Sequence, residues 1–132
     1  MIALDSNVLA RYLVRDDARQ SALAKSVIES ECSADEPGII SLVALCELVW
    51  VLDRGYGYSR ADIAAVLRKL LGSGDVRIER SELAWQALND FERRSADFAD
   101  YLIGYCGKAE NASATVTFDR RAASSELFRL LK

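Results

Sequence analysis

Carboxylates that follow predicted strands are the side chains of this sequence best placed to do chemistry. Asp5 directly follows the apolar residues 2–4, and Asp119 directly follows the β-branched stretch 114–118. Open α/β sheets bind ligands at the carboxyl ends of their parallel strands, which lie at one edge of the sheet. We therefore expect Asp5 and Asp119 to be neighbours, with Thr117 on the same side of its strand as Asp119.

Three more carboxylates are predicted near the same edge. Glu47 is the only charged residue between positions 39 and 52, in a stretch that we expect to form an apolar, buried helix. A carboxylate buried there is costly unless it is paired or binds a metal. Asp97 and Asp100 are three residues apart, so they share one face at the start of a helix predicted for residues 97–109.

Several carboxylates at one edge favour a metal site. Like charges raise one another's pKa values, and a bound cation removes that conflict. Carboxylate and water oxygens suit Mg²⁺ or Mn²⁺ rather than zinc or copper. The chain has no histidine, so mechanisms with an imidazole base or ligand are excluded. Because a carboxylate-bound divalent cation can activate water and offset phosphoryl charge, the sequence predicts a metal-dependent phosphodiesterase.

Each of these acids also has a purely structural interpretation. Asp5 could cap a helix, and Asp97 and Asp100 could complement a helix dipole. Asp119 could be a turn residue, and Glu47 could belong to a buried ion pair. All of these roles would have to hold at once, and we consider that coincidence improbable.

The elements that must position these acids alternate along the chain. Strands are expected at residues 2–4, 38–40, 76–78 and 114–118. Helices are expected after Asp5 and within 18–32, 41–54, 59–71, 81–91, 97–109 and 122–131. Alternating strands and helices favour parallel βαβ units. The predicted fold is α/β, a single domain over residues 1–132 in the form of a three-layer α/β/α sandwich with a central parallel sheet.

Net charge and arginine content bear on whether the protein can bind nucleic acid. The net charge is -3, but excluding Asp5, Glu47, Asp100 and Asp119 leaves a slightly basic remainder, and arginine greatly outnumbers lysine. Arginine grips phosphate bidentately, so RNA contacts are expected from the candidates Arg11, Arg15, Arg93, Arg94, Arg120 and Arg121.

The remaining apolar features are typical of a cytosolic protein. Trp50 and Trp85 are expected to be core or interface anchors, and the three cysteines small core residues. With no signal peptide and no apolar run long enough for a membrane span, we expect a cytoplasmic protein without membrane contact.

Four ordered segments, at residues 4–9, 41–52, 97–103 and 117–119, resemble the PIN-domain nucleases, and most of all the VapC toxins of bacterial type II toxin–antitoxin pairs. The resemblance implies a PIN-like fold, a Mg²⁺- or Mn²⁺-dependent endoribonuclease, a homodimer and inhibition by a cognate VapB-type antitoxin.

By position, the resemblance assigns Asp5, Glu47 and Asp100 to the acidic trio of the family and Asp119 to its more variable fourth acid. Asp97 matches a frequently acidic position of lesser weight. Supporting positions are Asn7, Thr117 and Ser6, the last of which keeps a hydroxyl where the family often has threonine.

Two other functions remain open from the residues alone. Asp5 after the first strand could be the nucleophile of a phospho-acceptor or phosphatase domain. The haloacid-dehalogenase-like pattern has a second aspartate where this chain has Asn7, which counts against that interpretation. The acids could also form a non-catalytic pocket that docks a basic partner.

Overall fold

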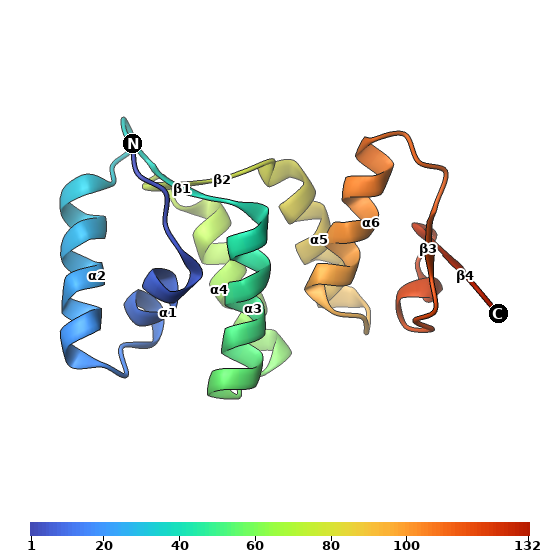
Figure 1. Ribbon diagram of the computed structural model, residues 1–132, viewed down its shortest axis with the longest axis horizontal. Coiled ribbons are helices and arrows are strands. Elements are labelled where there is room, and N and C mark those ends of the chain that lie inside the picture. The colour runs from blue at the N-terminus through green and yellow to red at the C-terminus, as the bar shows by residue number, and fades with distance from the viewer. The chain divides into compact units, whose positions relative to one another are not determined.

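The computed structural model describes residues 1–132, which fold as two compact units, residues 1–81 (unit 1) and 82–132 (unit 2). The elements of unit 1 are α1 (Ser6–Val14), α2 (Ala18–Glu31), β1 (Gly38–Ile40), α3 (Leu42–Tyr56), α4 (Arg60–Gly72) and β2 (Val76–Ile78). The remaining elements are α5 (Ser81–Arg93), α6 (Phe98–Ala109), β3 (Thr115–Thr117), the short 3₁₀ helix η1 (Ala122–Ser124) and β4 (Phe128–Leu130). Figure 1 labels the six α-helices and the four strands, coloured in chain order.

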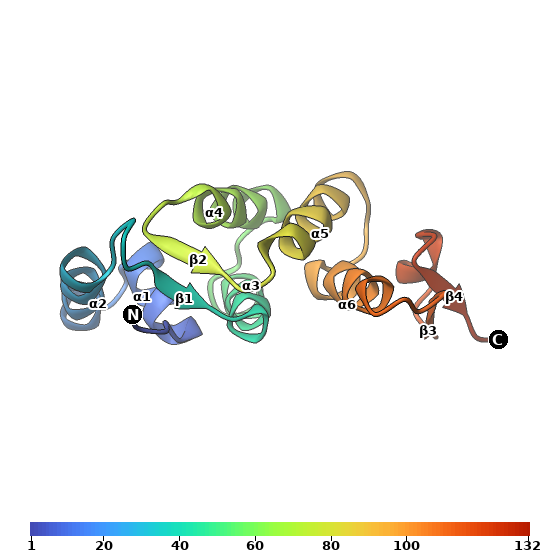
Figure 2. The same ribbon diagram turned by 90° about the horizontal axis from the view of Figure 1, so that it is seen from above.

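The sheet of unit 1 pairs β1 with β2 in parallel, with Ile40 opposite Ile78. Figure 2 shows the two strands side by side. Residue Ala3 adds an isolated parallel bridge to Ile39, and the Leu4 N–H donates to the Ile39 carbonyl at 2.8 Å. Asp5 therefore leaves the sheet directly after its paired segment, as predicted.

Helix α3 holds unit 1 together through one face. Leu45, Leu48 and Leu52 recur at helical spacing and are fully buried. Ser41 caps the helix, because its side chain accepts a hydrogen bond from the Ala44 N–H. Gly57 follows at φ 66°, a left-handed conformation that glycine adopts without strain.

Unit 2 combines α5, α6 and a second sheet. Strand β3 pairs with β4 in parallel. Phe91 of α5 and Phe98 of α6 meet edge to face, with ring centroids 6.2 Å apart. Tyr101 and Phe98 are fully buried, and Gly104 leaves room for the Phe128 ring, because a Cβ there would come within 2.9 Å of it. The core of this unit therefore mixes aromatic with aliphatic side chains, whereas the core of unit 1 has no buried aromatic residue.

The α/β class and parallel pairing are confirmed, but the expected single central sheet is not found. The structure has two two-stranded sheets, β1–β2 and β3–β4. Each strand has only three residues, and only β1 has partners on both sides, namely β2 and the segment around Ala3. The expected helices and strands within residues 38–109 are observed with small changes at their ends.

The C-terminal segment differs most from expectation. Residues 122–131 were expected to be an amphipathic helix, but they form η1 and then β4. Ser125 Oγ accepts from the Leu127 N–H at 3.2 Å, and Ser124 Oγ donates to the Arg121 carbonyl at 2.7 Å. Such serine contacts compete with helical hydrogen bonds, and pairing with β3 then favours the strand.

The burial expected for Glu47 is also wrong, because its side chain is exposed. Trp50 is 61% exposed, so it is not a core residue, and its alternative role as an interface anchor stays a prediction. Both lie on the face opposite the buried leucines, which shows that α3 is amphipathic in packing although its sequence is apolar almost all round. Of the cysteines, Cys32 is buried and the other two are partly buried, and all three are free thiols. No helix combines the length and apolar character needed to cross a bilayer.

Candidate functional site

Unit 1 brings two of the predicted carboxylates together through one hydroxyl. Asp5 caps α1, with its Oδ1 accepting from the Ser6 N–H at 2.7 Å. Ser6 is only 5% exposed, and its Oγ donates to Glu47 Oε2 at 2.8 Å while lying 3.4 Å from Asp5 Oδ1. The Asp5–Ser6–Glu47 arrangement therefore fixes two carboxylates against one buried serine.

A cleft opens beside this pair. It has a volume of about 340 Å³ and is lined by residues from the first strand segment and the start of α3, namely Ala3, Leu4, Asp5, Ser41, Val43, Ala44 and Glu47. Both carboxylates thus reach a space that a small hydrated cation or a phosphate group could enter.

Glu79 is a further carboxylate at this edge of the sheet, and the sequence analysis missed it. It directly follows β2, and its N–H donates to the Ile40 carbonyl at 2.9 Å. Its Oε1 accepts from the Leu42 N–H at 2.9 Å, so it satisfies a free donor in the first turn of α3. The sequence feature that could have identified Glu79 is the one used for Asp5, namely an acidic residue directly after a predicted strand. The contact makes Glu79 a cap for the helix that carries Glu47.

Unit 2 holds the other predicted acids. Asp97 precedes α6, and its N–H donates to Asp100 Oδ2 at 3.2 Å. Desolvation raises the pKa of the Asp100 carboxyl, and the negative charges of Asp97 and Asp119 raise it further, although the Asp97 N–H opposes the shift. Asp97, Asp100 and Asp119 therefore share one electrostatic environment in which a bound cation would be favourable.

Asp119 sits in a turn that follows β3. Its Oδ1 accepts from the Arg121 N–H at 2.8 Å and from the Ala122 N–H at 3.3 Å. The Asp119 N–H in turn donates to Thr117 Oγ1 at 3.0 Å. Thr117 therefore holds the backbone of Asp119, and the Asp119 side chain does stabilise a turn, the structural role considered for it above. Asp5 and Asp119 belong to different units, so their proximity stays a prediction.

The predicted ligands can be compared with the preferences of the cation that the sequence implies. Every predicted ligand is a carboxylate, and the chain has no histidine, which fits the oxygen preference of Mg²⁺ and Mn²⁺. No group of three or more acidic, cysteine or histidine side chains is arranged to hold a metal ion. The chemistry of the predicted ligands thus fits the cation. Asp5 and Glu47 lie in unit 1, whereas Asp97, Asp100 and Asp119 lie in unit 2.

The arginines predicted to contact RNA fall into two classes. Three are engaged with the protein: Arg11 with Asp16 at 2.8 Å, Arg15 over the Tyr12 ring at 5.8 Å, and Arg94 with Asp90 at 3.9 Å. The others, Arg93, Arg120 and Arg121, are exposed, as Arg15 and Arg94 are.

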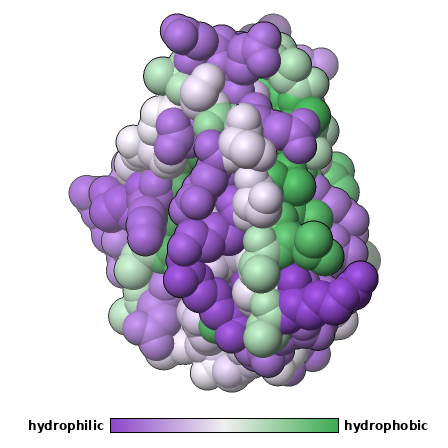
Figure 3. Space-filling view, turned by 90° about the vertical axis from the view of Figure 1, so that its left-hand side faces the viewer, coloured by the Kyte–Doolittle hydropathy of each residue, from purple (hydrophilic) through white to green (hydrophobic).

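Asn7 does not line the cleft at Asp5 and Glu47. It is exposed at a neighbouring cleft of about 570 Å³, which shares Ala3 and Leu4 with the first and is also lined by Val8, Arg11 and Leu23. The α2 side of unit 1 is mostly hydrophilic, with a hydrophobic strip along one edge (Figure 3). A supporting role for Asn7 at the acidic pair thus stays a prediction.

Comparison with known proteins finds similarity to one domain family. The sequence profile described as "PIN domain" matches residues 2–125. A VapC ribonuclease of Aquifex aeolicus (strain VF5) is 25% identical over 121 residues, covering 92% of this chain and 89% of that protein. Because the profile covers nearly the whole sequence and both units, this chain belongs to the PIN domain family.

Proposed function

We propose that this protein is a metal-dependent endoribonuclease of the VapC kind, which hydrolyses phosphodiester bonds in RNA as the toxin of a toxin–antitoxin pair. The observation that carries the proposal is the Asp5–Ser6–Glu47 arrangement, in which two carboxylates face one cleft directly after a sheet segment. The family match and the similarity to a VapC ribonuclease support it. In this proposal residues 1–132 act as one PIN domain.

The carboxylates are assigned as ligands of Mg²⁺ or Mn²⁺. Asp5, Glu47 and Asp100 are the principal ligands, Asp119 is the fourth acid, and Asp97 adds negative charge beside Asp100. A divalent cation held by such groups lowers the pKa of water and offsets the charge that develops on a phosphoryl group. The raised pKa of Asp100 supports its assignment, because a carboxylate that is costly to ionise among other acids gains most from a nearby cation.

Other residues position the ligands and the substrate. Ser6 orients Glu47 through its hydroxyl, and Thr117 holds the backbone of Asp119. We assign RNA phosphate contacts first to the exposed Arg93 and Arg120, and only secondarily to Arg11, Arg15 and Arg94, which already contact protein groups. Phosphate contacts of this kind make RNA binding weaken as salt rises.

The partners follow from the proposed role. The substrate is RNA, the regulator is a cognate VapB-type antitoxin, and the active form is a homodimer in the cytoplasm, where the RNA is. The cleft at Asp5 and Glu47 is the surface that RNA would have to reach. The metal dependence can be tested without knowing the antitoxin.

The test is RNA cleavage by the purified protein with Mg²⁺, with Mn²⁺ and with a chelator. Asp5→Asn and Asp100→Asn should each reduce cleavage by more than the roughly 10–100-fold loss typical of groups that only orient a metal ligand. Asp53→Asn is the matched control, because the Asp53 side chain is 60% exposed and forms an ion pair with its neighbour Arg54. Full cleavage by both folded variants, or cleavage that survives the chelator, would overturn the proposal.

A further inference from the structure

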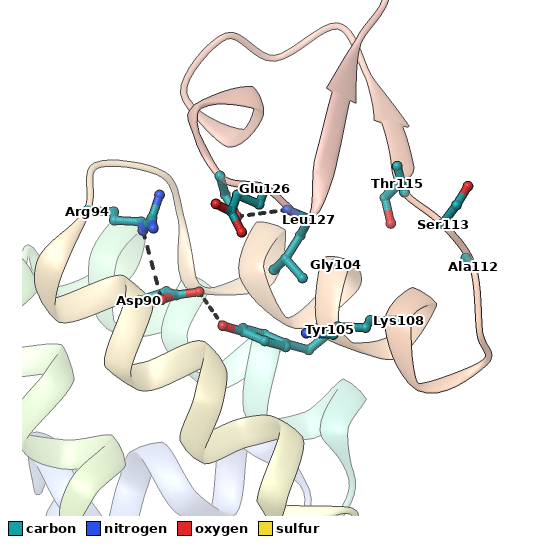
Figure 4. A pocket seen from close by; sticks show the side chains of 12 residues that line it. Asp90, Arg94, Gly104, Tyr105, Lys108, Ala112, Ser113, Thr115, Glu126 and Leu127 are labelled. Carbon is teal, nitrogen blue, oxygen red and sulfur yellow. Dashed lines mark hydrogen bonds and ion pairs between the residues drawn. The ribbon is translucent and has the colours of Figure 1, made fainter.

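A chain of polar contacts runs along one side of unit 2, outside the acids already described. The Tyr105 hydroxyl of α6 donates to Asp90 Oδ2 of α5 at 2.6 Å. Arg94, the residue directly after α5, places its Nε 3.9 Å from Asp90 Oδ1. Figure 4 shows these three side chains meeting at the base of a pocket of about 290 Å³. Asp90 is the shared partner, and no argument from the sequence had singled it out.

The contacts continue into the segment that holds Asp119. Arg94 Nη1 donates to the Ser124 carbonyl at 3.3 Å, across 30 positions of the sequence. Ser124 ends η1, and the Ala123 N–H at the middle of η1 donates to the Asp119 carbonyl at 3.0 Å. The route therefore passes from α6 through Asp90 and Arg94 to the turn that carries the Asp119 carboxylate.

The environment of Asp90 favours these contacts. Its side chain is only 18% exposed, so its charge needs partners. Burial and the Asp90 carboxylate raise the pKa of Tyr105 to about 12, which keeps the phenol protonated as a donor. By contrast, the side-chain hydrogen bonds of Asp119 and Thr117 span two or three positions in an exposed turn. Local contacts define the shape of the turn, and the Arg94 contact attaches it to the helices.

We propose that Asp90, with Tyr105 and Arg94, is a positioning group that fixes the Asp119 turn against α5 and α6. The proposal rests on the proposed function for the role of Asp119 as a metal-binding acid. It reassigns Arg94 from a contact with RNA to a contact that orients the protein's own acidic turn. Asp90 and Tyr105 touch neither substrate nor metal in this scheme.

The experiment compares Asp90→Asn, Tyr105→Phe and the matched control Glu82→Gln, an exposed acid on the same helix. The first readout is amide hydrogen exchange of the metal-free protein, resolved at Arg121, Ala122 and Ala123. Asp90→Asn should speed exchange at these amides several-fold more than at the buried core of α6, and Tyr105→Phe should do so less, because it leaves the Asp90–Arg94 contact in place.

The second readout is Mn²⁺ affinity measured by electron paramagnetic resonance, with no RNA present. Asp90→Asn should weaken binding by about tenfold, within the range for groups that orient metal ligands, while the melting temperature changes little. The proposal is overturned if exchange in the turn matches that of Glu82→Gln, if exchange rises equally throughout unit 2, or if Mn²⁺ affinity is unchanged. Failure of the wild-type protein to bind Mn²⁺ would instead overturn the proposed function, whereas the exchange result would still report on the turn.

Discussion

The two groups of acids are held in place by different kinds of contact. In unit 1, Ser6 and Glu47 meet across 41 positions of the sequence, so their contact exists only when α1 and α3 have packed. In unit 2, the Asp97–Asp100 hydrogen bond and those of Asp119 span at most three positions. The first group depends on the core of its unit, whereas the second can form from local turn and helix-start geometry. Changes to the core should therefore disturb the first group more than the second.

The largest effect is expected from the core beneath Glu47. Leu48→Ala removes a fully buried side chain next to Glu47 and should lower the free energy of unfolding by about 2–5 kcal/mol. Leu23→Ala is the control, because Leu23 is 54% exposed on a helix of the same unit. Urea unfolding measures both, and equal losses would show that α3 does not hold unit 1 in the way described.

A smaller effect is expected from the hydroxyl that joins the first pair. Ser6→Ala removes the hydrogen bond to Glu47 and should cost about 1 kcal/mol. Ser6→Thr keeps the hydroxyl and should lose less. Ser30→Ala, which removes only a local bond to the Ser26 carbonyl on an exposed helix face, serves as the comparison. If Ser6→Ala were as mild as Ser30→Ala, the contrast between long-range and local contacts would be lost.

Removing the charge of Asp100 in unit 2 should have the opposite effect on stability from the two substitutions in unit 1. The folded-state pKa of Asp100 lies above its ordinary value of 3.8, so its contribution to stability is fully present below that pH and is lost as pH rises through the folded pKa. At neutral pH, Asp100→Asn should therefore raise the melting temperature of the metal-free protein slightly, because solvent screens this partly exposed group. The gain should vanish at pH 3, and a variant that is less stable at neutral pH would contradict the assigned cause.

The smallest effect is expected at the surface of unit 1. Arg11 and the Tyr56 hydroxyl both hydrogen-bond to Asp16, which lowers the pKa of the Asp16 carboxyl. Its contribution to stability is present above the ordinary value of 3.8 and is lost as pH falls through the folded pKa. Asp16→Asn should lower the melting temperature only slightly at neutral pH, and high salt should shrink the difference further. A loss as large as that of Ser6→Ala would contradict this ranking.

The sequence predicted much of this molecule because its signals were local. The caps at Ser41 and Ser59 start α3 and α4 where helices were expected to begin. The helix predicted within residues 122–131 is wrong. The apolar spacing there suits a helix, but serine contacts and pairing with β3 favour the observed strand. Glu47 was expected to be buried because spacing alone does not show which face of an apolar helix meets the core.

What the sequence by itself determined is the set of carboxylates, the absence of histidine and the positions of most helices, since residue type and short-range hydrogen bonding fix these. Only the tertiary structure decided which partners those acids have. It joined Ser6 to Glu47, placed Glu79 on the first turn of α3, and directed Arg94 to Asp90 and the Ser124 carbonyl. Each of these contacts except Arg94–Asp90 spans dozens of positions, and a bond between distant residues depends on how whole elements pack, which no local pattern of side chains encodes.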